Sequence, residues 1–189
     1  AAEFAAAGLV CSMAWGDRPA LFAEHVDRAR AAGFEAVAAG KGTRHLPALH
    51  ASTPETVRER FGWSAELVER GRLNPKTFDS FLDGARSGIE MTAVRDAAGL
   101  RPQAGGLAFP PASRFALVEV CKPAAEGGTL EVAGTTEVIS ALTRGGEAAP
   151  AHLQHGAHVV IAAGDDCARW CFEAYDKPPA RSFRYAALY

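Results

Sequence analysis

One lysine of this chain lies between two glycines at the end of an apolar run, in the stretch EAVAAGKGTRHLP at residues 35–47. A lysine taken out of water can lose its proton near neutral pH and can then act as an acid or a base toward a reacting carbonyl group. Gly40 and Gly42 would let the backbone turn sharply and let a ligand come close. Lys41 is therefore a candidate catalytic residue, and an ordinary turn lysine is the alternative.

A second group of charged residues shares one side of a predicted helix. Asp79, Asp83, Arg86 and Glu90 follow one another at spacings of four, three and four residues, which places them on one stripe. An arginine in such a stripe can clamp a carboxylate or a phosphate, and the three carboxylates could bind a divalent cation. A solvated helix face is the alternative, in which each ion pair contributes only about 0.3–0.5 kcal/mol.

Histidines and cysteines give weaker signals. His45 and His50 follow Lys41 in the predicted loop, where acid-base or metal chemistry and a plain polar role are both open. Three more histidines occur in AHLQHGAHVV, but no fourth zinc ligand is suggested there. Two of the four cysteines are four residues apart in DDCARWCFEAY, a spacing for which burial in a core is favoured over redox or metal chemistry.

The elements that would position Lys41 follow the order strand, helix, strand. Residues 8–16 and 34–40 are apolar runs that predict strands, and the segment from Pro19 to Gly33 predicts the helix between them. This order implies a parallel pair of strands with a right-handed crossover. Ligands gather at the carboxyl ends of strands in parallel sheets, so we expect Lys41 at such an end.

The middle of the chain predicts helices. Two short helices are expected between residues 50 and 73, the second of them capped by Ser64. One longer helix is expected over 75–98. Gly84 and Gly88 lie inside it and each cost roughly 1 kcal/mol relative to alanine, which indicates that something packs close to this helix.

The last third of the chain changes character. Short segments rich in β-branched residues, separated by glycine-rich turns, predict a mixed or antiparallel sheet. They lie at residues 115–121, 128–134, 135–143 and 156–164. A helix is expected over DDCARWCFEAYDK, and no element is expected in the closing RSFRYAALY. The fold class is α/β followed by α+β.

Composition limits the function classes. The 189 residues are 48% hydrophobic and 22% charged, enough to bury a substantial core, and the formal net charge is -2. Nucleic acids and anionic membrane surfaces attract clustered Lys and Arg, so neither is expected as a partner. No apolar run approaches the roughly 20 residues that span a bilayer, and no basic and apolar leader is present. A cytoplasmic protein with a small-molecule substrate is expected.

Several longer stretches together resemble a known family. They are SMAWGDRPAL, FEAVAAGKGTRHLP, STPETV, NPKTFDSFLDGARSGIEM, GLAFPP, EGGTLEVAGTTEV and RYAALY. In this order they resemble the homoserine dehydrogenase-like NAD(P)-dependent oxidoreductases, and more closely the subgroup of a 1-deoxy-D-xylulose 5-phosphate reductoisomerase-like enzyme. The resemblance covers nearly the whole chain.

The resemblance implies roles for particular residues. In homoserine dehydrogenases a lysine after an apolar strand lies near the nicotinamide and the substrate, and VAAGKG looks like that site, with Lys41 as the counterpart. The family also has a helix with an aspartate and, four residues later, a substrate-contacting lysine. Asp83 matches that aspartate, but the cation here is Arg86, three residues on. Arginine stays charged, so Arg86 would orient the substrate and Lys41 would move the proton.

These features give one overall interpretation. Residues 1–42 would be the C-terminal βαβ part of a Rossmann-type nucleotide-binding domain, and residues 43–189 a mixed-sheet substrate-binding and dimerisation domain of a homodimer. The chain starts without methionine and contains no GxGxxG, so we expect a fragment that lacks the pyrophosphate-binding half and is inactive in isolation. The complete enzyme would transfer hydride between NADP or NAD and a carbonyl of a small polar substrate. A phosphorylated substrate is one of the alternatives.

The expected site follows from this interpretation. Lys41 and Asp83 are the catalytic candidates, the substrate-binding candidates are Arg86, Glu90 and His50, and the cofactor-binding candidates are Gly40 and Gly42. A divalent cation is expected only for the reductoisomerase-like version, and its ligands are unknown. The alternative function is a non-catalytic module that binds a small molecule or a partner subunit.

Overall fold

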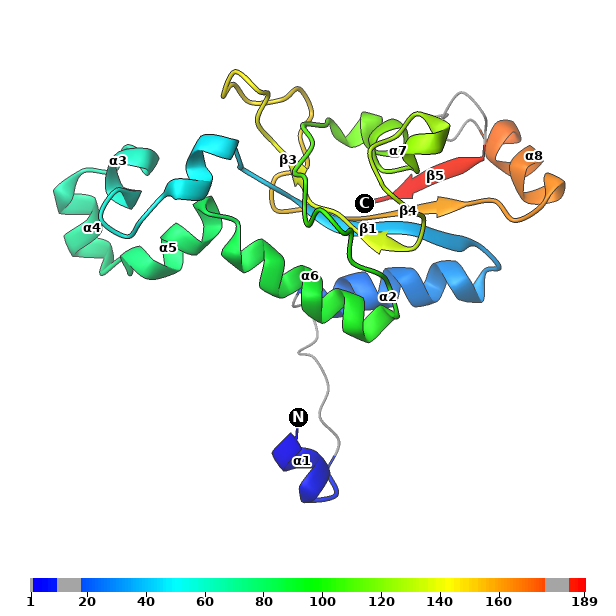
Figure 1. Cartoon of the computed structure of the whole chain (residues 1–189), viewed down its shortest axis with the longest axis horizontal. Helices are drawn as coiled ribbons and strands as arrows, with labels where there is room; N and C mark the ends of the chain where they lie inside the picture. The colour runs from blue at the N-terminus through cyan, green and yellow to red at the C-terminus, as the bar shows by residue number, and fades with distance from the viewer. Residues whose placement is uncertain (1, 10–17, 176–183) are drawn as a thin grey trace.

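The computed structural model describes residues 2–9, 18–175 and 184–189. Its strands form one mixed sheet in the order β2-β1-β4-β5, and β3 also pairs with β1 (Figure 1). The strands are β1 (Glu35–Thr43), β2 (Thr135–Thr136), β3 (Ile139–Ser140), β4 (Ala157–Ala162) and β5 (Tyr185–Leu188). β1 pairs in parallel with β2 and β3 and antiparallel with β4, so the predicted mixed sheet is confirmed.

Helices surround this sheet. The α-helices are α1 (Ala2–Ala6), α2 (Arg18–Ala31), α3 (Val57–Phe61), α4 (Ala65–Gly71), α5 (Pro75–Leu82), α6 (Ala85–Ala98), α7 (Leu117–Val120) and α8 (Asp166–Ala174). Short 3-10 turns lie at η1 (Pro47–Ala51), η2 (Arg114–Ala116) and η3 (Ala124–Glu126). In Figure 1, α2 and α6 run beneath the sheet, α7 lies above it, and α3, α4 and α5 form a separate group at one side.

The core has one layer on each face of the sheet. Phe22 and Val26 of α2 and Met91 and Val94 of α6 are buried with Val159 of β4 on one face. Side chains of α7 fill the other face, together with alternate residues of the same strands. Successive strand residues point to opposite faces, so a sheet covered on both sides needs the continuous apolar runs seen in β1 and β4.

The helix predicted from Pro19 to Gly33 is confirmed, whereas most of the strand predicted before it lies outside the described residues. α2 covers the expected segment and buries Phe22, Val26 and Ala29. Gly33, with φ of 86°, reverses the chain into β1. Most of the strand predicted at 8–16 falls on residues 10–17, outside the described part of the chain. The parallel pair and its crossover therefore stay a prediction.

The strand that carries Lys41 is longer than predicted. β1 continues through Thr43, so Lys41 lies inside the strand and the expected turn at Gly40 is wrong. The extension is held by pairing with β3 at Gly42 and Thr43 and with β4 at Lys41. The domain boundary expected after residue 42 falls within this strand, and the boundary stays a prediction.

The single helix predicted over 75–98 is two helices. α5 ends at Leu82 and α6 begins at Ala85, because Gly84 adopts φ of 89°, which breaks the helical path. The Asp83 side chain accepts a hydrogen bond from the Ala85 N–H at 2.7 Å and so caps α6. The stripe through Asp79, Asp83, Arg86 and Glu90 is therefore interrupted.

The two helix glycines have different surroundings. A Cβ on Gly84 would lie 3.2 Å from the Phe109 ring, so the expected close packing is found there. A Cβ on Gly88 would meet nothing within 4 Å, so the expectation is wrong at that position. Gly88 instead opens onto a pocket beside α6.

The C-terminal half contains fewer strands than predicted. Residues 115–121 fold into η2 and α7 in place of a strand, because Leu117, Val118 and Cys121 then all face the sheet. Residues 128–134 form no named strand, and 135–143 supplies only the short β2 and β3. β4 and α8 are confirmed, whereas β5, for which nothing was predicted, forms an edge of the sheet.

Within the described residues, none of the helices combines the length and the apolar character needed to cross a membrane.

Candidate functional site

Lys41 is buried in the middle of the molecule. Its side chain is only 2% exposed, and its ammonium donates a hydrogen bond to the Glu90 carboxylate of α6 at 2.5 Å. Burying a charge is costly unless a partner neutralises it, and Glu90 provides that partner. The alternative of an ordinary turn lysine does not fit this position, because β1 is an internal strand and the side chain is out of solvent.

Glu90 is shared by three cations. Its Oε2 bonds Lys41, and its Oε1 accepts from the Arg86 Nε at 2.9 Å. An Arg18 guanidinium nitrogen at the start of α2 lies 3.7 Å from the same Oε1. The cluster of Lys41, Glu90, Arg86 and Arg18 has three positive charges around one negative charge, so it can attract an anionic group of a ligand.

Burial and neighbouring charges shift the pKa values of both members of the pair downward. Burial lowers the lysine pKa, the Glu90 hydrogen bond and charge oppose that effect, and Arg18 and Arg86 add to it. For the Glu90 carboxyl, burial alone would raise the pKa, but Lys41, Arg18 and Arg86 hold it below its usual range. Glu90 is thus an ionised anchor, and Lys41 is the member whose proton is loosened.

Gly40 and Gly42 are required by the neighbouring strands. A Cβ on Gly40 would lie 1.6 Å from the Glu137 carbonyl oxygen, and one on Gly42 would lie 1.8 Å from that of Leu153. The close approach expected at these glycines is therefore made by the protein's own backbone. The cofactor role of these two glycines stays a prediction.

Asp83 and His50 lie away from the Lys41 cluster. The Asp83 carboxylate caps α6, and its backbone carbonyl accepts from the His50 ring Nδ1 at 2.8 Å when that nitrogen carries the proton. Both residues line a pocket on the flank of α6 that carries Gly88. Gly88 and Glu90 are two positions apart, and residues so spaced point to opposite sides of a helix. The structure therefore brings together Lys41, Arg86 and Glu90, but not Asp83 and His50.

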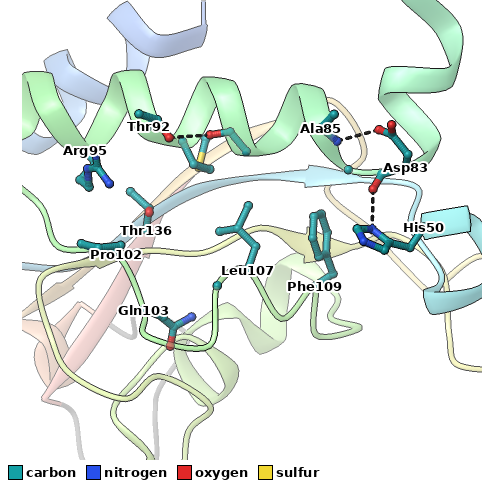
Figure 2. Close-up of a pocket in the computed structure, with 14 residues that line it drawn as sticks. His50, Asp83, Ala85, Thr92, Arg95, Pro102, Gln103, Leu107, Phe109 and Thr136 are labelled. Atoms are coloured by element: carbon teal, nitrogen blue, oxygen red, sulfur yellow. Dashed lines mark hydrogen bonds between the residues drawn. The ribbon is translucent and has the colours of Figure 1, made fainter. Parts of the chain in front are cut away.

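The pocket beside Gly88 has a volume of about 590 Å³. Figure 2 shows it between α6, which contributes Thr92 and Arg95, and the loop that carries Gln103, Leu107 and Phe109. Its charged groups already have partners, since Arg95 pairs with Asp96 at 2.8 Å. Lys41 does not line this pocket.

A buried carboxylate holds the loop beneath this pocket. Glu137 is fully buried and accepts hydrogen bonds from the Gln103 side chain at 2.5 Å and from the backbone N–H of Ala108 at 3.1 Å. Burial raises the pKa of Glu137, and these hydrogen bonds partly offset the rise. Phe109, with φ of 49°, stacks on His45 with ring centroids 4.0 Å apart. Glu137 and Phe109 therefore fix the wall of the pocket.

The expected cation ligands do not meet. Glu90 is occupied by its cations and Asp83 by its cap, while Asp79 lies buried on α5 with no hydrogen-bond partner for its Oδ1. In the described part of the chain, no three His, Cys, Asp or Glu side chains gather in a way that could hold a metal ion. These residues therefore do not fit a divalent cation, and no step is assigned to one.

Sequence reasoning missed two members of the site. Arg18 was not singled out, and its ion pair with Glu90 joins residues far apart in the sequence. His155 was considered only with its neighbouring histidines, yet its backbone N–H donates to the Gly42 carbonyl at 3.1 Å. Burial lowers the pKa of His155, and the charges of Arg18 and Lys41 lower it further. No spacing in the sequence relates residue 155 to residue 41.

A buried lysine whose pKa is lowered and a carboxylate that pairs with it therefore form the candidate site on a mixed α/β scaffold. The chain matches the model of the family described as Oxidoreductase DRL, catalytic domain, over residues 16–189. It therefore belongs to that family, and its role is that of an oxidoreductase catalytic domain. A search of curated proteins finds no match to this chain.

Proposed function

We propose that this chain is the substrate-binding and catalytic portion of a nicotinamide-dependent oxidoreductase that interconverts a carbonyl and an alcohol. The observation that carries the proposal is the buried Lys41 ammonium, anchored by Glu90 and surrounded by Arg18 and Arg86. The family match supports an oxidoreductase, and the resemblance to homoserine dehydrogenases supports the nicotinamide cofactor. NADP and NAD remain equivalent choices.

Lys41 acts on the carbonyl oxygen in this proposal. In the direction of reduction the carbonyl carbon gains a hydride, and the oxygen gains a proton from the Lys41 Nζ to complete the alcohol. A pKa lowered by burial makes that proton easier to give. Glu90 holds the ammonium in place, and a water-poor site strengthens the attraction between the ammonium and the developing negative oxygen.

The excess positive charge selects the substrate. Arg86 is partly exposed, with 42% of its side chain accessible, so it can meet a ligand while it bonds Glu90. A guanidinium clamps a carboxylate or a phosphate through two parallel hydrogen bonds. The substrate class is therefore a small carbonyl compound with an acidic group, and hydroxy-carbonyl compounds with and without a phosphate belong to it.

The test uses the natural full-length protein with NADPH and with NADH, against a panel of small carbonyl acids and phosphates. Lys41→Met is expected to lower kcat by about 100-fold or more, because one general acid contributes about 10²- to 10⁴-fold. Lys76→Met is the matched control, since Lys76 is exposed on α5. Circular dichroism confirms that each variant is folded. Turnover by Lys41→Met at the rate of the unmodified protein would overturn the proposal.

A homodimer, a cytoplasmic location and the absence of nucleic-acid and membrane partners stay predictions.

A further inference from the structure

Two cavities adjoin each other beyond the carboxyl end of β1, where the chain leads toward the α3–α5 group (Figure 1). The first has a volume of about 360 Å³ and the second a volume of about 450 Å³. Leu46 and Leu142 line both of them, so the two cavities share a wall. Arg44 and Arg60 line the first cavity, and Arg144 lines the second. We call the first cavity, together with these three arginines, the arginine pocket.

The positive charges of the arginine pocket are not used by the protein itself. Within the part of the chain that the structure describes, the side chains of Arg44, Arg60 and Arg144 form no ion pair and no hydrogen bond. Glu59 also lines the first cavity, so two guanidinium groups there face one carboxylate. Arg86 differs from these arginines, because it already forms an ion pair on α6. The arginine pocket is therefore a concave surface with an excess of positive charge.

The backbone on both sides of Arg44 is fixed by hydrogen bonds. The Ala141 N–H donates to the Thr43 carbonyl at 2.7 Å. On the other side of Arg44, the Ser140 hydroxyl donates to the His45 carbonyl at 2.6 Å. Because these bonds hold the residues before and after Arg44, the direction in which its side chain leaves the backbone is set without a ligand. A site prepared in this way loses less conformational entropy when a ligand binds.

The other two arginines also belong to ordered segments. Arg144 lies in a turn that is closed by the Thr143 N–H, which donates to the Glu147 carbonyl at 2.7 Å. Gly146, with φ of 90°, belongs to the same turn and lines the first cavity, so the turn brings Arg144 to the edge of that cavity. Arg60 belongs to α3. Three separate segments of the chain therefore supply the three guanidinium groups.

We propose that the arginine pocket binds the phosphate group of a small phosphate monoester. A guanidinium stays charged and presents planar N–H donors that match two phosphate oxygens at once. Arg44 and Arg60 would bind these oxygens inside the first cavity, and Arg144 would meet the phosphate from the side of the second. Several like charges around one concavity raise the local concentration of an anion, and the effect is larger for a dianion than for a monocarboxylate.

The size and the position of the arginine pocket agree with this assignment. A volume of about 360 Å³ is at the lower end of ligand pockets, which suits a small ester. Arg44 directly follows β1, and β1 is parallel to both β2 and β3. Ligands gather at the carboxyl ends of parallel strands. The phosphate can belong to the substrate or to a separate effector, and the contacts that bind it are the same. Phosphate binding does not depend on the proposed function.

Calorimetric titration of the natural full-length protein, in a phosphate-free buffer of low ionic strength, tests this proposal. Inorganic phosphate and glycerol 3-phosphate are the ligands, and glycerol is the uncharged comparison. We expect both phosphates to bind at one site per chain and glycerol not to bind. Arg44→Gln and Arg60→Gln should each weaken the binding of glycerol 3-phosphate by about tenfold or more. Arg44→Lys should weaken it less, because it keeps the charge and loses only the planar donors.

Arg70→Gln is the matched control. Arg70 is exposed on α4 and lines neither cavity, so this variant removes the same charge from outside the arginine pocket. We expect it to bind glycerol 3-phosphate within about twofold of the unmodified protein, because exposed charges at a distance are screened by salt. Circular dichroism confirms that each variant is folded.

Binding and turnover give separate answers. Lys41→Met should keep the affinity for glycerol 3-phosphate, so an absence of turnover in the unmodified protein contradicts the proposed function alone. Inhibition by inorganic phosphate that added substrate relieves, with a raised KM in Arg44→Gln, supports the pocket and assigns the phosphate to the substrate. Inhibition that added substrate does not relieve supports the pocket and assigns the phosphate to a separate effector. If neither phosphate binds, or if Arg70→Gln weakens binding as much as Arg44→Gln does, the arginine pocket is not a phosphate site.

Discussion

The Lys41–Glu90 pair should respond very differently to the loss of each partner. Glu90→Gln keeps the shape of the side chain but removes the negative charge, and it leaves an ammonium that is 2% exposed beside Arg18 and Arg86. Lys41→Met keeps an unbranched side chain and removes the positive charge. Glu90 then still bonds Arg86 at 2.9 Å and keeps Arg18 within 3.7 Å.

The magnitudes follow from this asymmetry. Breaking a buried pair so that one charge stays uncompensated costs about 3–5 kcal/mol. Glutamine still offers an oxygen to Lys41, and the lysine can lose its proton, so we expect roughly 3 kcal/mol for Glu90→Gln at pH 7. We expect less than about 1 kcal/mol for Lys41→Met, because its carboxylate partner remains paired and the stem volume is conserved.

The pH dependence has a definite sign. In Glu90→Gln the folded-state pKa of Lys41 lies further below that of the unfolded chain, since the raising effect of Glu90 is gone. Between these two values the unfolded chain binds more protons, so stability increases as pH rises. The cost of the substitution should therefore shrink from pH 7 to pH 9.

Urea unfolding followed by circular dichroism at both pH values measures these differences. Glu24→Gln is the matched control, because Glu24 pairs with Arg28 at 2.7 Å on α2 and that arginine is 71% exposed, and such surface pairs contribute about 0–1 kcal/mol. Equal costs for Glu90→Gln and Lys41→Met, or a cost of Glu90→Gln that does not change with pH, would refute the reasoning.

Three other predictions concern activity, acid stability and glycine positions. In the direction of reduction kcat/KM should fall as pH rises through the Lys41 pKa, and in Glu90→Gln a pH-rate profile should place this fall at lower pH. Burial lowers the pKa of His158 from 6.5 to about 4, so the unfolded chain binds the extra proton between these values. As the pH falls from 6.5 to about 4, the protein should therefore lose about 3 kcal/mol of stability. The His158→Leu variant, measured by urea unfolding over the same pH range, should show no such loss. Thermal unfolding should show that Gly88→Ala stabilises the folded protein by up to about 1 kcal/mol, because a Cβ at this position meets nothing within 4 Å. Gly40→Ala should instead prevent normal folding, because its Cβ would overlap the Glu137 carbonyl oxygen. A destabilised Gly88→Ala would contradict the open surroundings of that residue.

Sequence patterns predicted correctly those helices and strands whose conformation depends mainly on residues close together in the chain. The helix from residue 18, the Ser64 cap and β4 were predicted because periodicity, capping chemistry and β-branched content act within a few residues. The strand predicted at residues 115–121 was wrong because the conformation of this segment depends on contacts with distant parts of the chain. Their apolar sequence suits a strand, but contact with the second face of the sheet favours the helix α7.

The candidate site was predicted only in part for a similar reason. Lys41, Arg86 and Glu90 were selected from residue type and spacing, and the structure joins them in one cluster. Asp83 was placed with them because the helix was expected to be continuous. The positive φ of Gly84 ends that continuity, and Asp83 faces another pocket.

The sequence by itself determined which residues could do chemistry, since a glycine-flanked lysine and a charged stripe can be recognised from type and spacing. Only the tertiary structure decided that Lys41 is buried, that Glu90 is its partner 49 residues away, and that Arg18 and His155 lie around them. It also decided that Gly40 and Gly42 face the protein's own carbonyl oxygens. The physical reason is that burial and charge pairing depend on which strands and helices pack together. Those long-range contacts leave no periodic trace in the sequence.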